Sequence, residues 1–273
     1  MGAVESPSSA SVSAPCGRLD TSALPSNQPA AGGSLYPGFP WKTFNSKALV
    51  VVYETDLEPV LDLLPPELSP LTDPPQVVCF LNGGYEFGTG GGPYQEMAPL
   101  LPVLYEDEPH IYPWVVYLGE GTEEWFAAGR EVLADSKKLA KIEVKQELGR
   151  GLIMGTVERP AGHRLVTQIV GPLERQCDES EFSFYPIIGI RLLPNGEGDG
   201  PQVAELYRKE VETTVRKASD GTAMMFAGPA TIVLGQSEQD PLYKLPVRKV
   251  VAGYYVEFGT INQKSGHAVK RYV

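Results

Sequence analysis

Cysteine and histidine are scarce in this sequence, which limits the metal and redox chemistry that it can support. Cys16, Cys79 and Cys177 lie far apart and form no C-x-x-C pair, so neither a structural zinc site nor a dithiol redox motif is expected. The three histidines have no partner at metal-site spacing. We therefore expect no metal and no other cofactor, and a reducing compartment suits the isolated thiols.

Basic residues are also in short supply. The chain has 23 Lys and Arg against 34 Asp and Glu, a formal net charge of -11. Nucleic-acid affinity depends largely on Lys and Arg that neutralise phosphates, so we expect no nucleic-acid partner. An anionic small molecule could still bind, but only in a local cationic pocket that works against the overall field.

Long hydrophobic runs are absent. No stretch approaches the roughly 18 apolar residues that a membrane span needs, and the N-terminus lacks the basic start and apolar core of a signal peptide. These absences predict a cytoplasmic protein without a membrane partner.

The composition predicts one folded domain preceded by an arm. Residues 1–33 are rich in Ser, Ala, Pro and Gly, which bury too little apolar surface to offset the entropy of ordering, so we expect a flexible N-terminal arm. Hydrophobic residues make up 42% of the chain, an ordinary globular proportion. Residues 34–273 are therefore expected to form a single domain.

Short runs of Val, Ile, Leu and aromatic residues, separated by Gly and Pro, dominate this domain and predict strands. They lie at residues 48–53, 76–81, 100–105, 111–118, 140–146, 152–157, 164–170, 182–192, 203–211, 230–234 and 247–258. Two helices are marked, one capped by Thr55-Asp56 and one opening at Thr122. Because a large antiparallel sheet exposes its edges unless it closes, we expect a mainly β fold, a closed or cone-shaped antiparallel barrel.

A lysine pair, Lys137-Lys138, follows the second helix. Such pairs usually decorate a solvated surface. An amine attacks a ketone only when it is unprotonated, however, and free lysine has a pKa of about 10.4. Burial and a neighbouring cation both lower a lysine pKa, by up to about 3–5 units for full burial. A catalytic lysine here would need an apolar pocket.

The segment around this pair, GREVLADSKKLAK, resembles the active-site segment of acetoacetate decarboxylases. Further matches occur in the same order: VYETD at residues 52–56, GPYQE at 92–96, LPN at 193–195 and LPV at 245–247. The similarity spans about residues 40–258. It implies a cone-shaped antiparallel barrel, homo-oligomeric assembly and a small keto-acid or ketone substrate.

The resemblance also implies roles for individual residues. Lys137 corresponds to the family's lysine that forms a Schiff base with the substrate, the mechanism for which acetoacetate decarboxylase is the standard example. Lys138 corresponds to a neighbour that perturbs its charge, and Glu96 to an active-site glutamate that acts as an acid or base or holds a cation. The candidates for substrate binding are Arg130, Glu131, Tyr94 and Ser46.

Three departures from the family pattern keep the net reaction open. The family's active-site arginine aligns with Ser46 beside Lys47, a second glutamate falls near the apolar Phe80 or Leu81, and Ser136 replaces the proline before the lysine pair. The first hypothesis is a Schiff-base lyase that decarboxylates a β-keto acid. The alternatives are an aldolase, dehydratase or cyclase of the same fold that acts on a polyketide-like ketone, and a barrel that binds a hydrophobic metabolite without covalent chemistry.

Overall fold

The computed structural model describes residues 17–22, 33–83, 86–87, 95–147, 151–181 and 184–273. The chain divides into two compact units, residues 1–35 and 36–273, so the division lies two residues beyond the boundary expected from composition. Most of the predicted arm falls outside the described residues, and its flexibility stays a prediction. The account below concerns the second unit.

Two α-helices occur where the sequence predicts them. They are α1 (Leu57–Leu61) and α2 (Glu123–Glu131), and the short 3-10 helices are η1 (Glu179–Glu181) and η2 (Leu242–Lys244). The expected side-chain cap of α1 is wrong: Asp56 is the N-cap residue but caps nothing, because its carboxylate accepts two hydrogen bonds from Arg248 at 2.9 and 2.6 Å.

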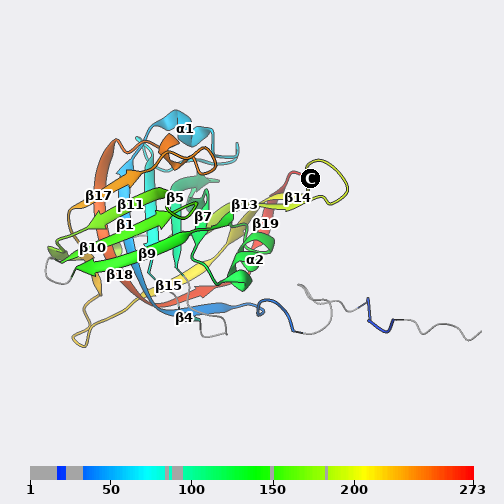
Figure 1. Cartoon of the computed structure of the whole chain (residues 1–273), viewed down its shortest axis with the longest axis horizontal. Helices are drawn as coiled ribbons and strands as arrows, with labels where there is room; N and C mark the ends of the chain where they lie inside the picture. Colours follow the sequence, from blue (N-terminus) through cyan, green and yellow to red (C-terminus); the bar gives the residue numbers. More distant parts are fainter. Residues whose placement is uncertain (1–16, 23–32, 84–85, 88–94, 148–150, 182–183) are drawn as a thin grey trace, which may run out of the picture. The chain divides into compact units, whose positions relative to one another are not determined.

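Strands account for most of the remaining chain, and a 15-stranded sheet dominates (Figure 1). Its members are β1 (Trp41–Glu54), β2 (Ser69–Pro70), β3 (Gln76–Asn82), β4 (Glu86–Phe87), β5 (Glu96–Tyr105), β6 (Glu108–Pro113), β7 (Val116–Leu118), β8 (Lys137–Leu139), β12 (Arg175–Gln176), β13 (Ile187–Pro194), β14 (Pro201–Lys209), β15 (Val211–Val215), β16 (Met225–Ala227), β18 (Lys249–Gln263) and β19 (His267–Arg271). A second sheet of four strands has the order β17 (Ala230–Leu234), β11 (Arg164–Val170), β10 (Leu152–Glu158) and β9 (Lys141–Glu147). The mainly β class is therefore confirmed.

The path of hydrogen-bonded neighbours in the large sheet is open. It runs from β12 through β16, β18, β1, β3, β5, β6, β13 and β14 to β19. β15 follows β14 after Glu210 and pairs with β18, so it links distant members of this path. Among the strands that the structure describes, the ladder is not continuously closed, and the closed barrel stays a prediction.

The main hydrophobic core packs one face of the large sheet against the four-stranded sheet. Leu81 on β3 illustrates this contact, because a Cβ on Gly155 of β10 would lie only 2.7 Å from its Cδ1. Glycine at position 155 therefore lets the two sheets approach closely. Along β3 and β5 the side chains alternate between this core and the opposite face, and that opposite face carries the site described below.

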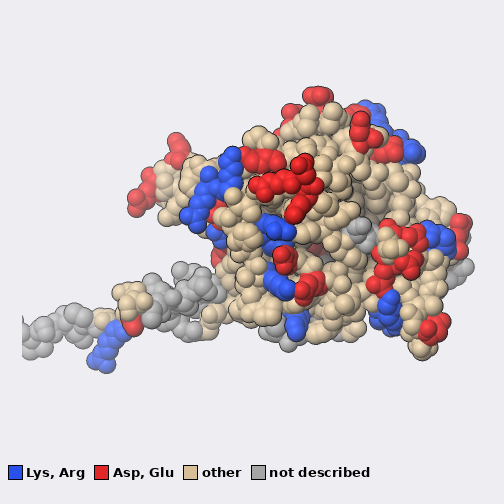
Figure 2. Space-filling model, turned by 180° about the vertical axis from the view of Figure 1, so that it is seen from behind, with Lys and Arg blue, Asp and Glu red and all other residues tan. Residues whose placement is uncertain are grey.

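Charges of both signs are interspersed over the face shown in Figure 2, without a broad basic surface there. Within the described part of the chain, no helix is long and apolar enough to cross a membrane. The same residues contain no group of three or more His, Cys, Asp or Glu side chains arranged to hold a metal ion.

Candidate active site

The turn between α2 and β8 positions Lys137. Ala134 adopts a left-handed conformation with φ of 61°, which reverses the chain after the helix. The Asp135 N–H then donates to the Gly129 carbonyl at 3.0 Å and the Lys137 N–H to the Asp135 carbonyl at 2.8 Å. β8 pairs in parallel with β7, and Val116 lies opposite Lys137. Both ends of this short segment are thus fixed by backbone hydrogen bonds.

The Lys137 side chain is buried, with 4% of its surface exposed. Its Nζ donates to the Trp125 carbonyl at 3.0 Å and lies 4.0 Å from Oε2 of Glu96. Trp125 packs edge-on against Trp41, with ring centroids 5.3 Å apart. The amine therefore lies in a largely apolar setting, with the Glu96 carboxylate within reach.

The Lys137 side chain packs directly against Gly129 of α2. A Cβ at this position would lie 2.3 Å from Cδ and Cε of Lys137 and 2.8 Å from its Nζ. Heavy atoms cannot approach so closely, so no residue larger than glycine fits while Lys137 keeps this conformation. The glycine of the GRE motif is thus explained by the packing of the lysine stem.

Gly129→Ala should therefore lower activity by about 100-fold, because displacing a reacting group by about 1 Å can cost that much. Alanine normally favours a helix over glycine by about 1 kcal/mol, so lost folding is not the expected cause. Steady-state kinetics with a keto-acid substrate would measure the effect. Gly196→Ala is the matched control, since a Cβ there meets nothing within 4 Å; equal activities of the two variants would contradict this role of Gly129.

Lys138 points to the other face of β8. Its Nζ contacts Asp240 Oδ1 at 2.7 Å and the Gln239 carbonyl at 2.7 Å, and 35% of its side chain is exposed. Asp240 is buried and also binds Arg159 at 3.1 Å and the Tyr117 hydroxyl at 3.1 Å. Successive side chains on a strand point to opposite faces, so Lys138 stabilises this network and does not line the cavity next to Lys137. A direct role in perturbing the amine stays a prediction.

A different cation faces the amine. Lys209, the last residue of β14, is buried and donates to Asp135 Oδ1 at 2.5 Å. Burial lowers the pKa of Lys209, Asp135 opposes that shift, and the charge of Lys137 adds to it. Sequence analysis missed both residues, and only the polar sequence YRKE at the end of a predicted strand could have drawn attention to Lys209.

The other predicted site residues occupy different places. Arg130 is exposed, and its Nη1 donates to the Lys137 carbonyl at 3.1 Å, so it holds the backbone of the lysine. Glu131 accepts a hydrogen bond from the Tyr36 hydroxyl at 2.8 Å. Ser46 is buried on β1 opposite Phe258, and Tyr94 lies outside the described residues.

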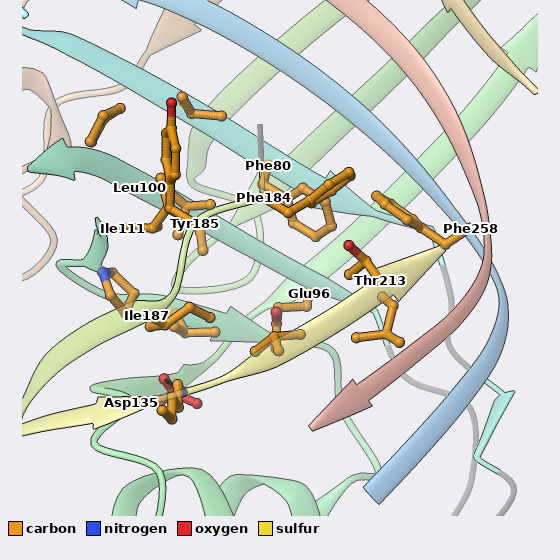
Figure 3. A pocket seen from close by; sticks show the side chains of 18 of the residues that line it. Phe80, Glu96, Leu100, Ile111, Asp135, Phe184, Tyr185, Ile187, Thr213 and Phe258 are labelled. Carbon is orange, nitrogen blue, oxygen red and sulfur yellow. Dashed lines mark hydrogen bonds and ion pairs between the residues drawn. The ribbon is translucent and has the colours of Figure 1, made fainter. Parts of the chain in front are cut away.

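Lys137 lines a cavity of about 500 Å³. Figure 3 shows this cavity from close by, with Glu96 and Asp135 among its labelled lining residues. Its charged lining near the amine consists of Glu96, Asp135, Lys137 and Lys209. Aliphatic and aromatic side chains from β1, β3, β5, β6 and β18 form most of the remaining wall, and examples are Val52, Phe80, Leu100, Ile111 and Phe258. Such a cavity, apolar with a few convergent polar groups, is typical of small-molecule sites.

Known proteins resemble this chain over most of its length. The model of the acetoacetate decarboxylase family matches residues 23–272. The acetoacetate decarboxylase of Ralstonia nicotianae is 27% identical over 232 residues, which cover 84% of this chain and 86% of the relative. That of Acidiphilium cryptum is 27% identical over 226 residues, covering 81% and 86%.

Solved structures show the same fold. The acetoacetate decarboxylase of Legionella pneumophila superposes with a TM-score of 0.76 at 23% identity, covering 88% of this chain and 90% of that one. The enduracididine biosynthesis enzyme MppR, solved with pyruvate, superposes with a TM-score of 0.74 at 16% identity, covering 90% and 96%. With nearly its whole length matched by the family model, the chain belongs to the acetoacetate decarboxylase family.

Proposed function

We propose that this protein is a lyase that forms a Schiff base between Lys137 and the ketone of a β-keto acid and decarboxylates the substrate. The observation that carries the proposal is the buried amine of Lys137. This side chain lines an apolar cavity, and its Nζ lies 4.0 Å from Oε2 of Glu96. Family membership supports an enzyme that acts on a small keto acid.

The reaction balances with the groups present. The unprotonated Nζ attacks the ketone carbon, and a proton shift from nitrogen to oxygen gives a carbinolamine. Its hydroxyl takes up a second proton and leaves as water, which forms the iminium. The bond between the α-carbon and the carboxylate then breaks, and its electron pair moves toward the iminium nitrogen. Carbon dioxide departs, and an enamine remains on Lys137. A proton added to the α-carbon and hydrolysis by water release the ketone and restore the amine.

Glu96 is the best-placed group to move protons in this sequence. Its Oε2 lies 4.0 Å from Nζ, close enough to exchange a proton with the carbinolamine through a small movement or one water. It also partners the ammonium of Lys137 and the later iminium electrostatically.

A second function is favoured by the charges of the cavity. Asp135 already binds Lys209, and Glu96 lies beside Lys137, so each lysine lining the described cavity has a carboxylate near it. A substrate carboxylate would compete with these acids. A neutral ketone would not, which favours an aldol, dehydration or cyclisation step through the same iminium.

Borohydride trapping tests the covalent step. Incubation with hexanoylacetate and sodium borohydride should add the reduced adduct to the peptide that contains Lys137, detected by mass spectrometry after digestion, while the exposed Lys141 stays unmodified. Release of carbon dioxide without borohydride separates decarboxylation from the alternative reactions. An unlabelled Lys137, or a label on Lys209 instead, would contradict the proposal.

A further inference from the structure

The cavity extends far beyond the lysine along β5. Glu96, Ala98, Leu100 and Pro102 alternate along this strand and all line the cavity. Six residue steps of about 3.3 Å separate the first from the last, so this wall is roughly 20 Å long. A substrate as small as acetoacetate would fill only the end beside Glu96.

The chemistry of the wall changes along this length. Glu96 is its only charged member on β5, and the next positions are paired with apolar residues: Ala98 lies opposite Phe80 and Leu100 opposite Val78. Pro102 lies opposite Ile111 on β6. Beyond the first position, therefore, this wall offers a ligand aliphatic and aromatic surface.

Aromatic rings add to this apolar surface on the side of the cavity away from Asp135 (Figure 3). The Phe258 ring centroid lies 6.2 Å from that of Phe80 and 5.7 Å from that of Phe184. Glu181 also lines the cavity, but its carboxylate accepts a hydrogen bond from Arg175 at 2.7 Å. Asp135 and the aromatic group thus lie on different sides of the space, with Glu96 between them (Figure 3).

The cavity is also large enough for a ligand bigger than acetoacetate. Its volume of about 500 Å³ lies within the range of about 300–1,000 Å³ typical of pockets for drug-sized ligands. When an apolar group of a ligand displaces poorly ordered water from such a cavity, the affinity for the ligand increases. An apolar extension on the substrate would do so.

We propose that the substrate of this site carries a long or bulky apolar group, alkyl or aryl, on the carbonyl side away from the carboxylate, and that this group lies along β5 toward Phe80 and Pro102. The inference rests on the proposed function for its reactive end. It narrows the keto acid or ketone that the family resemblance implies to one with a long or bulky apolar extension.

A chain-length series tests the inference. Acetoacetate, butyrylacetate, hexanoylacetate and phenylpropionylacetate would each be trapped on the wild-type protein with borohydride, and the concentration that gives half-maximal labelling of Lys137 measured by mass spectrometry. This concentration should fall about fourfold for each methylene added to the alkyl chain. The phenyl compound should likewise label Lys137 at a lower concentration than acetoacetate does.

A blocking variant locates the apolar group. Ala98→Phe places a ring in the cavity between Glu96 and Leu100, so it should raise the half-maximal concentration for hexanoylacetate much more than that for acetoacetate and remove most of the long-chain preference. Val233→Phe on β17 is the matched control, because Val233 is exposed and lies outside the cavity lining; this variant should keep the full preference.

The outcomes separate the two proposals. If Lys137 is labelled equally well or better by acetoacetate than by the longer compounds, the substrate class is wrong and the Schiff base stands. Retention of the full long-chain preference in a folded Ala98→Phe would also overturn the placement along β5. If no compound labels Lys137, the covalent function itself fails, and the inference that rests on it fails too.

Discussion

Lys137→Met should lower turnover of hexanoylacetate by at least about 10⁴-fold, because removing a covalent nucleophile eliminates the iminium pathway altogether. Methionine has a similar length and no charge, so it suits the buried path over Gly129 and should preserve the fold. Release of carbon dioxide measured against the uncatalysed rate would give the loss. Thermal unfolding of the variant would confirm that it is folded.

Lys141→Met is the matched control for this experiment. Lys141 lies on β9, and its ammonium pairs with Glu143 and Glu158 at the surface, so its replacement should leave turnover within about twofold of the wild type. A folded Lys137→Met that retained turnover would exclude an imine at this position. Binding without covalent chemistry would then account better for the cavity.

Asp135→Asn should destabilise the protein by about 3 kcal/mol at neutral pH. The substitution leaves the buried ammonium of Lys209 without its carboxylate partner, and breaking one half of a buried ion pair typically costs about 3–5 kcal/mol. Chemical denaturation followed by circular dichroism measures the free energy of unfolding. Adding Lys209→Met to Asp135→Asn should recover most of the loss, because the unpaired charge is then gone.

The single variant Asp135→Asn should regain stability as the pH rises. Burial holds the pKa of Lys209 below its usual value, whereas the unfolded chain titrates at about 10.4. Between these two values the unfolded state binds more protons, so the free energy of unfolding increases with pH. Without the Asp135 carboxylate the pKa of Lys209 in the folded protein falls further. The pH range over which stability increases therefore begins at a lower pH. Asp56→Asn, which breaks the exposed pair with Arg248, should show neither effect. A flat profile for Asp135→Asn would contradict the lowered pKa of Lys209, because the folded and unfolded states would then bind equal numbers of protons.

Strand-forming composition was enough to predict the fold class. The predicted runs match strands because β-branched and aromatic side chains alternate between two faces, and this period is visible in a sequence. What the sequence missed was pairing at a distance. β15 and β19 are short and polar, and they form strands because β18 and β14 offer them free edges.

The candidate site was predicted unevenly for a similar reason. A motif identified Lys137 and Glu96, although 41 positions separate them in the sequence. Lys209 and Asp135 were missed because their pairing depends on the end of β14 meeting the turn after α2, a contact that no local pattern encodes. The resemblance assigned Lys138 to perturbing the charge of the amine; its side chain lies on the other face of β8, on Asp240, and that role stays a prediction.

The parallel pairing of β8 with β7 has a consequence for which amine reacts. β8 carries two lysines in succession, and only the alignment of Val116 with Lys137 directs the first of them into the cavity. A slip by one residue would exchange the faces of the strand and present Lys138 to the substrate in its place. If Lys137 is the nucleophile, as proposed, its selection over Lys138 is therefore encoded in strand register. A single-residue insertion or deletion between Ala134 and Lys137 would then turn Lys138 toward the cavity without altering either lysine.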